Sequence, residues 1–277
     1  MPPLKLLLLH GYTQSGPLFH AKSRALIKHI TKAFPHHEVS AIYPTGPLRL
    51  NPADIPGYEP PQPSQEGGST EQQPSDDKID AFGWYRRSNT ADPPLYLGLE
   101  DGLAAVADVL RAEGPFDGVI GFSQGAAMAA MVASLLEPGR KEAFAHFAPA
   151  DGVPFPAAFD GLAHPPFRFA LCYCGFRSPG ARYRAFYESP PLRTPVLHVL
   201  GTLDAVVDEG RSRALIEACA GDPEKEGKVV WHPGGHFLPS QRPYLDAAVQ
   251  FIREQLEGQA ETKKVDEEDV HDMELPF

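Results

Sequence analysis

The sequence predicts an α/β fold in which helices cover both faces of a mostly parallel central sheet. Apolar runs of strand length alternate with segments of helical periodicity, an order typical of parallel sheets. The first run, LKLLLL at 4–9, is apolar almost throughout, which indicates a strand buried on both faces. Such sheets bind ligands at the carboxyl ends of their strands, so functional residues are expected in the loops that follow strands.

Local patterns place each further element. The segment 98–113 repeats leucine and valine at helical spacing, and the helix expected at 18–34 ends before Pro35. A segment of small residues at 124–137 ends before Pro138 and Gly139. The expected strands are 4–9, 38–43, 116–122, 167–174, 194–201 and 227–232. The expected helices are 18–34, 98–113, 124–137, about 209–219 and about 240–256.

The chain of 277 residues is expected to form one domain over residues 1–257. Residues 51–78 contain six prolines, two adjacent glycines and no apolar periodicity, which predicts a disordered or lid-like insert. Residues 258–277 carry seven acidic residues and two lysines, which predicts a solvated, disordered tail.

Charge and composition exclude several classes of function. The net charge of −11 argues against binding to nucleic acid or to an anionic membrane, because both need a basic surface. Three cysteines are too few, and an odd number, for a disulfide framework, which fits a reducing compartment. The apolar run near the N-terminus is too short for a signal peptide or a membrane span. We therefore expect a cytoplasmic protein.

The strongest local signal for chemistry is Gly121-Phe122-Ser123-Gln124-Gly125, a G-x-S-x-G pattern between an expected strand and an expected helix. A nucleophile elbow holds its serine on such a strained strand-to-helix turn, and glycines fit where the chain is crowded on either side. The helix N-terminus also directs free N–H groups at the serine. We interpret Ser123 as a nucleophile; the alternative is an ordinary Ser-Gln helix cap.

A serine nucleophile needs a base, and the hydrolase arrangement places an acid and then a histidine after it in the chain. Asp204 follows the expected strand 194–201 and is our candidate for the acid; otherwise it is a turn aspartate. Asp208 competes for the role, but its place just before a helix is better explained by an N-cap.

Two histidines, His232 and His236, stand four residues apart in VVWHPGGHFLPS. A metal pair at this spacing needs a helix, and Pro233 with the two following glycines makes a helix improbable, so we predict no metal site. His232 ends the expected strand, whereas His236 follows a turn in the loop before the last helix. We predict His236 as the general base.

Acyl transfer places negative charge on a carbonyl oxygen, which preorganised N–H donors stabilise. One expected donor is the backbone N–H of Gln124, the residue after the nucleophile. The other is the N–H of Tyr12, or of Thr13 if the loop is shifted by one residue, in the loop after the first strand. His10 is interpreted as a structural loop histidine.

Six motifs occur in the order seen in the fungal-type family of serine hydrolases: LLLLHGYTQSG, FGWYRRS, FDGVIGFSQGAAMAAMVA, FALCYCGFR, TPVLHVLGTLDAVV and WHPGGHFLP. The chain resembles this family over residues 4–255. The resemblance implies an α/β-hydrolase fold, a catalytic triad of Ser123, Asp204 and His236, and action on carboxylic esters or thioesters of acyl chains. It implies no cofactor.

Some members of this family release polyketide acids from a synthase, so the resemblance raises an acyl-carrier domain as a partner. The polar insert at 51–78 departs from the compact members. Phe82, Trp84 and Tyr85 in AFGWYRRS are candidates for an apolar wall of the acyl pocket, with core packing as the alternative. The following arginines, Arg86 and Arg87, are candidates for attracting a carboxylate or phosphate on the substrate, although solvated surface arginines are commoner.

The predicted function is therefore hydrolysis of carboxylic esters or thioesters through an acyl-enzyme on Ser123. An alternative within this class is a thioesterase that releases a polyketide acid in secondary metabolism. An alternative from another class is a non-catalytic binding protein with a hydrolase fold, against which the complete Ser, Asp and His set argues.

Overall fold

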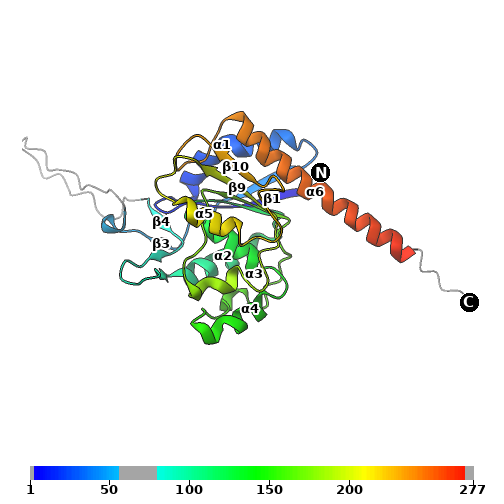
Figure 1. Cartoon of the computed structure of the whole chain (residues 1–277). Helices are drawn as coiled ribbons and strands as arrows, with labels where there is room; N and C mark the ends of the chain where they lie inside the picture. The colour runs from blue at the N-terminus through cyan, green and yellow to red at the C-terminus, as the bar shows by residue number, and fades with distance from the viewer. Residues whose placement is uncertain (1–2, 56–79, 272–277) are drawn as a thin grey trace, which may run out of the picture.

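The computed structural model describes residues 3–55 and 80–271, and over residues 259–271 it describes the backbone alone (Figure 1). Most of the predicted insert at 51–78 lies outside the described residues, as does the end of the predicted tail, residues 272–277.

Six strands form the central sheet, in the order β10-β9-β8-β7-β1-β2, and each strand is parallel to its neighbours. This order confirms the predicted fold class, because buried parallel strands with helical crossovers define it. No strand boundary differs from its predicted position by more than two residues. The strands are β1 (Pro3–Leu9), β2 (Glu38–Ile42), β7 (Gly118–Phe122), β8 (Phe169–Tyr173), β9 (Val196–Gly201) and β10 (Val229–His232).

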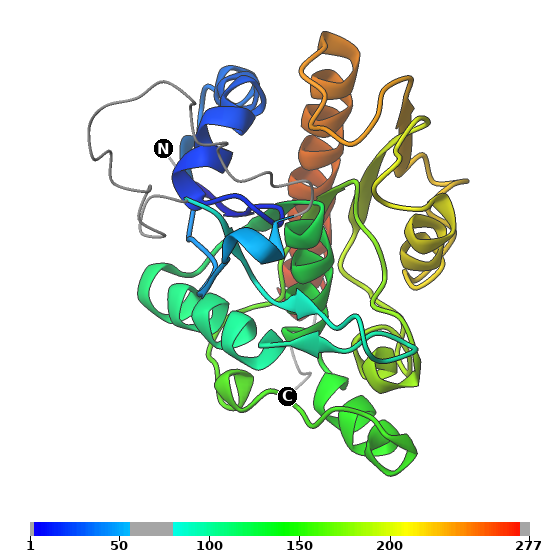
Figure 2. The same ribbon diagram turned by 90° about the vertical axis from the view of Figure 1, so that its left-hand side faces the viewer.

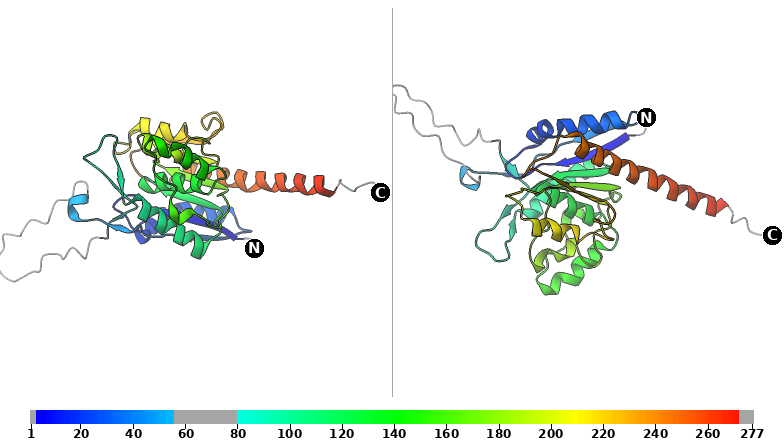
Figure 3. Two further views of the ribbon diagram at one scale, coloured as in Figure 1. Left: turned by 90° about the horizontal axis from the view of Figure 1, so that it is seen from below. Right: turned by 45° about the horizontal axis from the view of Figure 1, so that its top comes forward.

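Helices cover both faces of the sheet. Helices α1 (Gly16–Ala33) and α6 (Arg242–His271) pack together on one face. The other face carries α2 (Leu99–Glu113), α3 (Gln124–Leu135), α4 (Arg140–Phe147) and α5 (Glu209–Ile216), as Figure 3 shows.

Alternate side chains of each strand enter two separate cores. In β1, Leu7 and Leu9 join the core formed with α2 and α3, whereas Leu6 and Leu8 join the core formed with α1 and α6. This alternation follows from the period of two in a strand. Because both faces are covered, the continuous apolar run at 4–9 is explained.

Two small antiparallel ribbons lie beyond the sheet (Figure 2). One pairs β3 (Leu48–Arg49) with β4 (Phe82–Gly83), and the other pairs β5 (Arg86–Arg87) with β6 (Tyr96–Leu97). Short 3-10 helices occupy the loops, namely η1 (Pro52–Asp54), η3 (Ala148–Ala150), η4 (Ala157–Phe159) and η5 (Ala181–Phe186). The β3–β4 ribbon pairs residues that precede the insert with residues that follow it.

The C-terminal region differs from its prediction. Helix α6 was expected to end near residue 256, with a disordered tail from residue 258, but it continues to His271 and projects beyond the body (Figure 1). Residues 259–271 contain no proline or glycine, and seven of the thirteen are glutamate, lysine, alanine or glutamine, which favour helix. Acidic composition predicts a solvated segment but gives no reason for the helix to stop.

Within residues 3–55 and 80–271, no helix combines the length and apolar character needed to cross a membrane.

Candidate active site

Ser123 lies on the turn between β7 and α3, with φ of 54° and ψ of −117°. A positive φ is strained for a residue with a side chain, and strain of this kind is typical of a nucleophile elbow. A Cβ atom on Gly121 would lie 2.2 Å from the carbonyl oxygen of Gly125. A Cβ on Gly125 would lie 2.0 Å from the carbonyl oxygen of Leu9. The glycines therefore let α3 start directly against the sheet.

Three side chains form one hydrogen-bonded chain at the carboxyl ends of the strands. The distance from His236 Nε2 to Ser123 Oγ is 2.9 Å. The distance from His236 Nδ1 to Asp204 Oδ2 is 2.8 Å. Ser123 follows β7, Asp204 follows β9 and His236 follows β10, so three strand ends bring together residues that are distant in sequence. The arrangement is the one predicted for a serine nucleophile, a base and an orienting acid.

The carboxylate of Asp204 is fixed by the loop that follows it. Its Oδ1 accepts hydrogen bonds from the N–H groups of Val206 and Val207, both at 2.9 Å. Burial raises the pKa of Asp204, but the N–H of Val207, His236 and the N–H of Val206 outweigh it, so the pKa lies below its ordinary value. Asp204 is therefore a carboxylate at neutral pH. The competing Asp208 caps α5, where its Oδ1 accepts from the N–H of Gly210 at 2.9 Å.

The turn before His236 packs tightly against the end of β9. A Cβ on Gly201 would lie 2.4 Å from the carbonyl oxygen of Gly235, and the N–H of Leu203 donates to the carbonyl of Gly234. This contact joins the loop that carries Asp204 to the loop that carries His236. Gly234 and Gly235 thus allow the loop after β10 to pack closely against the loop after β9.

His232 has a different environment. It is 1% exposed, its Nδ1 accepts a hydrogen bond from the N–H of Gly234, and its ring packs beside Phe237 and Tyr244. Burial lowers its pKa, which favours the neutral ring. It does not share a cluster of possible metal ligands with His236 among the described residues. His232 ends β10, as the sequence predicted, and the structure adds that its ring packs in the interior.

One group of three possible ligands occurs in the described part of the chain: Cys174, Asp204 and His236, whose ligand atoms lie within 4.8 Å of one another. The Asp204 and His236 atoms are already hydrogen-bonded to each other. Burial raises the pKa of the Cys174 thiol to about 12, so the thiol stays protonated at neutral pH. A protonated thiol is a poor metal ligand, and the group is better explained as part of the serine site.

The predicted oxyanion donors flank the serine. Gln124 is the first residue of α3, so its N–H has no acceptor within the helix. Tyr12 lies in a tight turn closed by a hydrogen bond from the N–H of Gln14 to the carbonyl of Gly11. A Cβ on Gly11 would lie 2.9 Å from the ring of Phe122, so this turn packs directly against the elbow.

His10 lies directly before the turn at residues 11–14 and contacts it. It is fully buried, its Nε2 accepts from the N–H of Gly46 at 2.9 Å, and its Nδ1 lies 2.7 Å from the carbonyl oxygen of Gly11. Burial lowers its pKa to about 4, so the ring is neutral at neutral pH. This geometry agrees with a structural loop histidine.

The predicted aromatic wall is placed differently. Trp84 and Tyr85 are 0% and 2% exposed and belong to the core with α2 and α3, and Phe82 forms part of the β3–β4 ribbon. The indole N–H of Trp84 donates to the carbonyl of His10. The arginines that follow, Arg86 and Arg87, face a cavity instead. An apolar sequence pattern indicates that residues are buried, but it does not show whether they lie in the core or in the wall of a pocket.

The side chain of Gln124 has a role that the sequence did not indicate. Its Oε1 accepts from the N–H of Trp84 at 2.8 Å, and its Nε2 donates to the carbonyl of Tyr85 at 2.8 Å. The residue after the nucleophile thus holds the backbone of the segment that leads into β5. The contact between Gln124 and Trp84 joins residues about forty positions apart, so no local sequence pattern predicts it.

The fold and the Ser–His–Asp chain define this molecule as an α/β hydrolase with a serine-centred site. The description "Serine hydrolase (FSH1)" belongs to the family that matches residues 1–248, which is nearly the whole chain. The chain is a member of this serine hydrolase family, which confirms the resemblance seen in the sequence.

Individual relatives agree with this assignment. Esterase OVCA2 of Danio rerio is 33% identical over 261 residues, which cover 91% of this chain and 97% of that protein. A Schizosaccharomyces pombe protein named dihydrofolate reductase is 34% identical over 250 residues, and the match covers 90% of this chain but only 47% of that longer protein. The chain thus spans about half the length of this relative. Family membership and the esterase-named relative support a carboxylic ester hydrolase.

Solved structures show the same fold. The crystal structure of Zea mays acyl-protein thioesterase 2 superposes with a TM-score of 0.54 at 18% identity, covering 92% of this chain and 95% of that one. At this identity the similarity establishes architecture and leaves substrate to other arguments.

Proposed function

We propose that the chain hydrolyses carboxylic esters or thioesters of acyl chains through an acyl-enzyme on Ser123. The observation that carries this proposal is the continuous hydrogen-bonded chain from Ser123 through His236 to Asp204, on a strained elbow. The family assignment supports the same reaction class.

In this mechanism the oxygen of Ser123 attacks the carbonyl carbon while Nε2 of His236 takes its proton. The negative charge that develops on the carbonyl oxygen is stabilised by the N–H groups of Gln124 and Tyr12. His236 then gives the proton to the leaving alcohol or thiol. Asp204 holds the Nδ1–H tautomer and stabilises the imidazolium form. A water molecule, deprotonated by His236, then attacks the acyl-enzyme, and the acid is released as the proton returns to Ser123.

Labelling with a fluorophosphonate probe tests the proposal. The wild-type chain should react at one site, and Ser123→Ala should abolish the reaction. If the wild type does not label, or if Ser123→Ala labels equally, the chain is better explained as a non-catalytic binding protein with a hydrolase fold.

The finer proposal is thioester hydrolysis, with release of a polyketide acid from an acyl-carrier domain in secondary metabolism. Its support is the sequence resemblance to a family that includes polyketide thioesterases. Thiolate and alkoxide leave through the same tetrahedral intermediate, so the site chemistry accommodates both. Comparison of acyl-thioesters with oxygen esters of the same acyl chain separates them, and turnover of oxygen esters alone would refute the thioesterase role.

We also propose a cytoplasmic location. Its support is the set of free cysteines, Cys172, Cys174 and Cys219, all of which are buried. Fluorescence microscopy of the tagged chain in its native cell tests this location.

A further inference from the structure

A cavity of about 580 Å³ lies beside the proposed oxyanion donors. Tyr12 and Gln124 form the wall nearest to Ser123, and Arg86, Arg87 and Asn89 line other parts of it. The cavity is thus adjacent to the place where a substrate carbonyl must lie, and it is large enough for part of a substrate.

Among the described residues, one arginine that lines the cavity has no counter-ion. Arg86 forms an ion pair with Asp54, at 2.9 Å between Nη1 and Oδ1, which neutralises both groups. The side chain of Arg87 has no hydrogen-bond or ion-pair partner within residues 3–55 and 80–271. The chain as a whole carries a net charge of −11, so this guanidinium is a local positive charge on a protein that is acidic overall.

The segment that carries Arg87 is held in place relative to the nucleophile. The side chain of Gln124 binds the backbone of Trp84 and Tyr85, immediately before Arg86. Arg87 also pairs with Tyr96 across the β5–β6 ribbon. The ring of Tyr96 lies between those of Tyr85 and Tyr183, at centroid distances of 4.1 and 4.9 Å. These contacts give the guanidinium a rigid base, which lowers the entropy cost of binding a ligand.

We propose that this cavity binds an anionic group of the substrate, a carboxylate or a phosphate, and that Arg87 determines this specificity. The inference rests on the proposed ester or thioester hydrolysis and adds a substrate class to it. A guanidinium binds either anion through two parallel hydrogen bonds. The apolar side chains of Ile55 and Leu97 also line the cavity and provide a surface for the carbons that join the anion to the ester.

The anion can belong to the acyl chain or to the leaving group, and two matched substrate pairs distinguish these sources. The first pair is mono(4-nitrophenyl) glutarate and 4-nitrophenyl butyrate, which differ by a carboxylate on the acyl side. The second pair is butyryl-4′-phosphopantetheine and butyryl-pantetheine, which differ by one phosphate on the leaving group. For the pair that matches the natural substrate, the wild type should favour the anionic member in kcat/KM by roughly 10-fold. Added salt should weaken this preference.

Arg87→Gln should reduce the preference to near unity, Arg87→Lys should keep part of it, and Arg87→Glu should reverse it. The matched control is Arg242→Gln, because Arg242 is an exposed arginine on α6 that pairs with Asp246 far from the cavity. This control should leave both substrate ratios unchanged. A wild type without preference in either pair would overturn the proposal, as would an equal loss with anionic and neutral substrates in Arg87→Gln.

Fluorophosphonate labelling of the same variants keeps the two proposals separate. If labelling persists and the anion preference is absent, the cavity assignment fails while ester hydrolysis stands. If the wild type does not label, the proposed hydrolysis fails first.

Discussion

At the scale of single residues, the proposed nucleophile is one of five non-glycine residues with a positive φ in the described part of the chain. Ser123 has a positive φ, a conformation that costs of order 1–3 kcal/mol for a residue with a side chain. The strain directs Oγ out of the elbow toward His236. Function and stability therefore oppose each other at this residue.

The first prediction concerns the two histidines of the VVWHPGGHFLPS loop. His236→Ala should lower kcat by on the order of 10⁶, as should Ser123→Ala, because the triad acts as a unit. His232→Gln should retain most activity, since its ring contacts Phe237 and Tyr244 rather than Ser123. Steady-state kinetics with a neutral ester measures both. An active His236→Ala together with an inactive His232→Gln would reverse the assignment.

At the scale of elements, α3 owes its position to its first glycine. Every residue of α3 is buried, and most are alanine or methionine, so the helix lies close against β1, β7 and β8. The second prediction is that Gly125→Ala displaces α3 and removes both activity and several kcal/mol of stability, because its Cβ would meet the carbonyl oxygen of Leu9.

A second helical glycine provides the matched control. A Cβ on Gly258 in α6 would meet nothing within 4 Å. Gly258→Ala should therefore raise stability by up to about 1 kcal/mol through helix propensity. Urea unfolding of both variants tests the pair. Equal effects of the two substitutions would show that close packing of α3 does not depend on Gly125.

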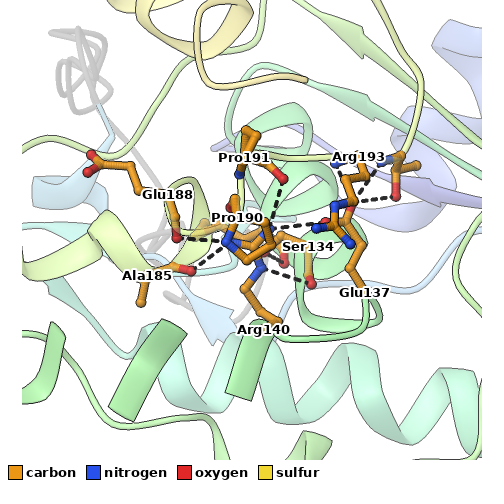
Figure 4. A network of polar contacts seen from close by, with 10 residues as sticks. Ser134, Glu137, Arg140, Ala185, Glu188, Pro190, Pro191 and Arg193 are labelled. Carbon is orange, nitrogen blue, oxygen red and sulfur yellow. Dashed lines mark hydrogen bonds and ion pairs between the residues drawn. The ribbon is translucent and has the colours of Figure 1, made fainter. Parts of the chain in front are cut away.

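The corner between α3 and α4 is held by a buried ion pair (Figure 4). Arg140 Nη2 lies 3.0 Å from Glu137 Oε2, and the side chains are 1% and 3% exposed. The guanidinium also donates to the carbonyls of Ser134, Ala185 and Pro190. Oε1 of Glu137 accepts from both the N–H and the hydroxyl of Thr194. The pair thus joins the helical corner to the loop that leads into β9.

The third prediction is that Glu137→Ala lowers the free energy of unfolding by about 3–5 kcal/mol, because it leaves a buried guanidinium without its counter-ion. The control is Asp160→Ala, which removes a partner from the exposed pair with Lys141 and should cost less than about 1 kcal/mol. Chemical denaturation measures both. A loss for Glu137→Ala no greater than that for Asp160→Ala would contradict this account.

At the scale of the whole molecule, buried neutral histidines link stability to pH. Burial lowers the pKa of His10 to about 4 and that of His198 to about 3, from an ordinary value of 6.5. Below pH 6.5 the unfolded chain binds protons that the folded chain excludes. The fourth prediction is that the free energy of unfolding falls as pH decreases from about 6.5 to about 4.

His10→Gln provides the test of this linkage. If His10 contributes, the slope of unfolding free energy against pH between about 4 and 6.5 should be smaller in this variant than in the wild type. The comparison uses slopes, so a uniform loss of stability from lost hydrogen bonds does not affect it. An unchanged slope would exclude His10 as a source of the acid sensitivity.

The sheet, and the meeting of Ser123, Asp204 and His236 at one edge of it, could be predicted from the sequence because both depend on local signals. Apolar runs mark the strands, and Ser123, Asp204 and His236 each follow a strand, so a parallel sheet brings them to one edge. The core positions of Trp84 and Tyr85 were harder to predict. These residues contact His10 and Gln124, which lie far away in the sequence. The extent of α6 was missed because acidic composition describes solvation and leaves open whether a solvated segment is helical.

The side chain of Gln124 connects the turn that carries Ser123 to the segment that lines the cavity. One residue supplies a main-chain donor beside Ser123 and, through its amide, fixes the strand that carries Arg87. Free energy gained by an anion in the cavity can therefore be transmitted to the geometry around the reacting carbonyl. Losses from Gln124→Met and Arg87→Gln should then not add, and a double-mutant cycle on kcat/KM would measure their coupling. Substrate specificity and rate enhancement would then both depend on the side-chain amide of Gln124.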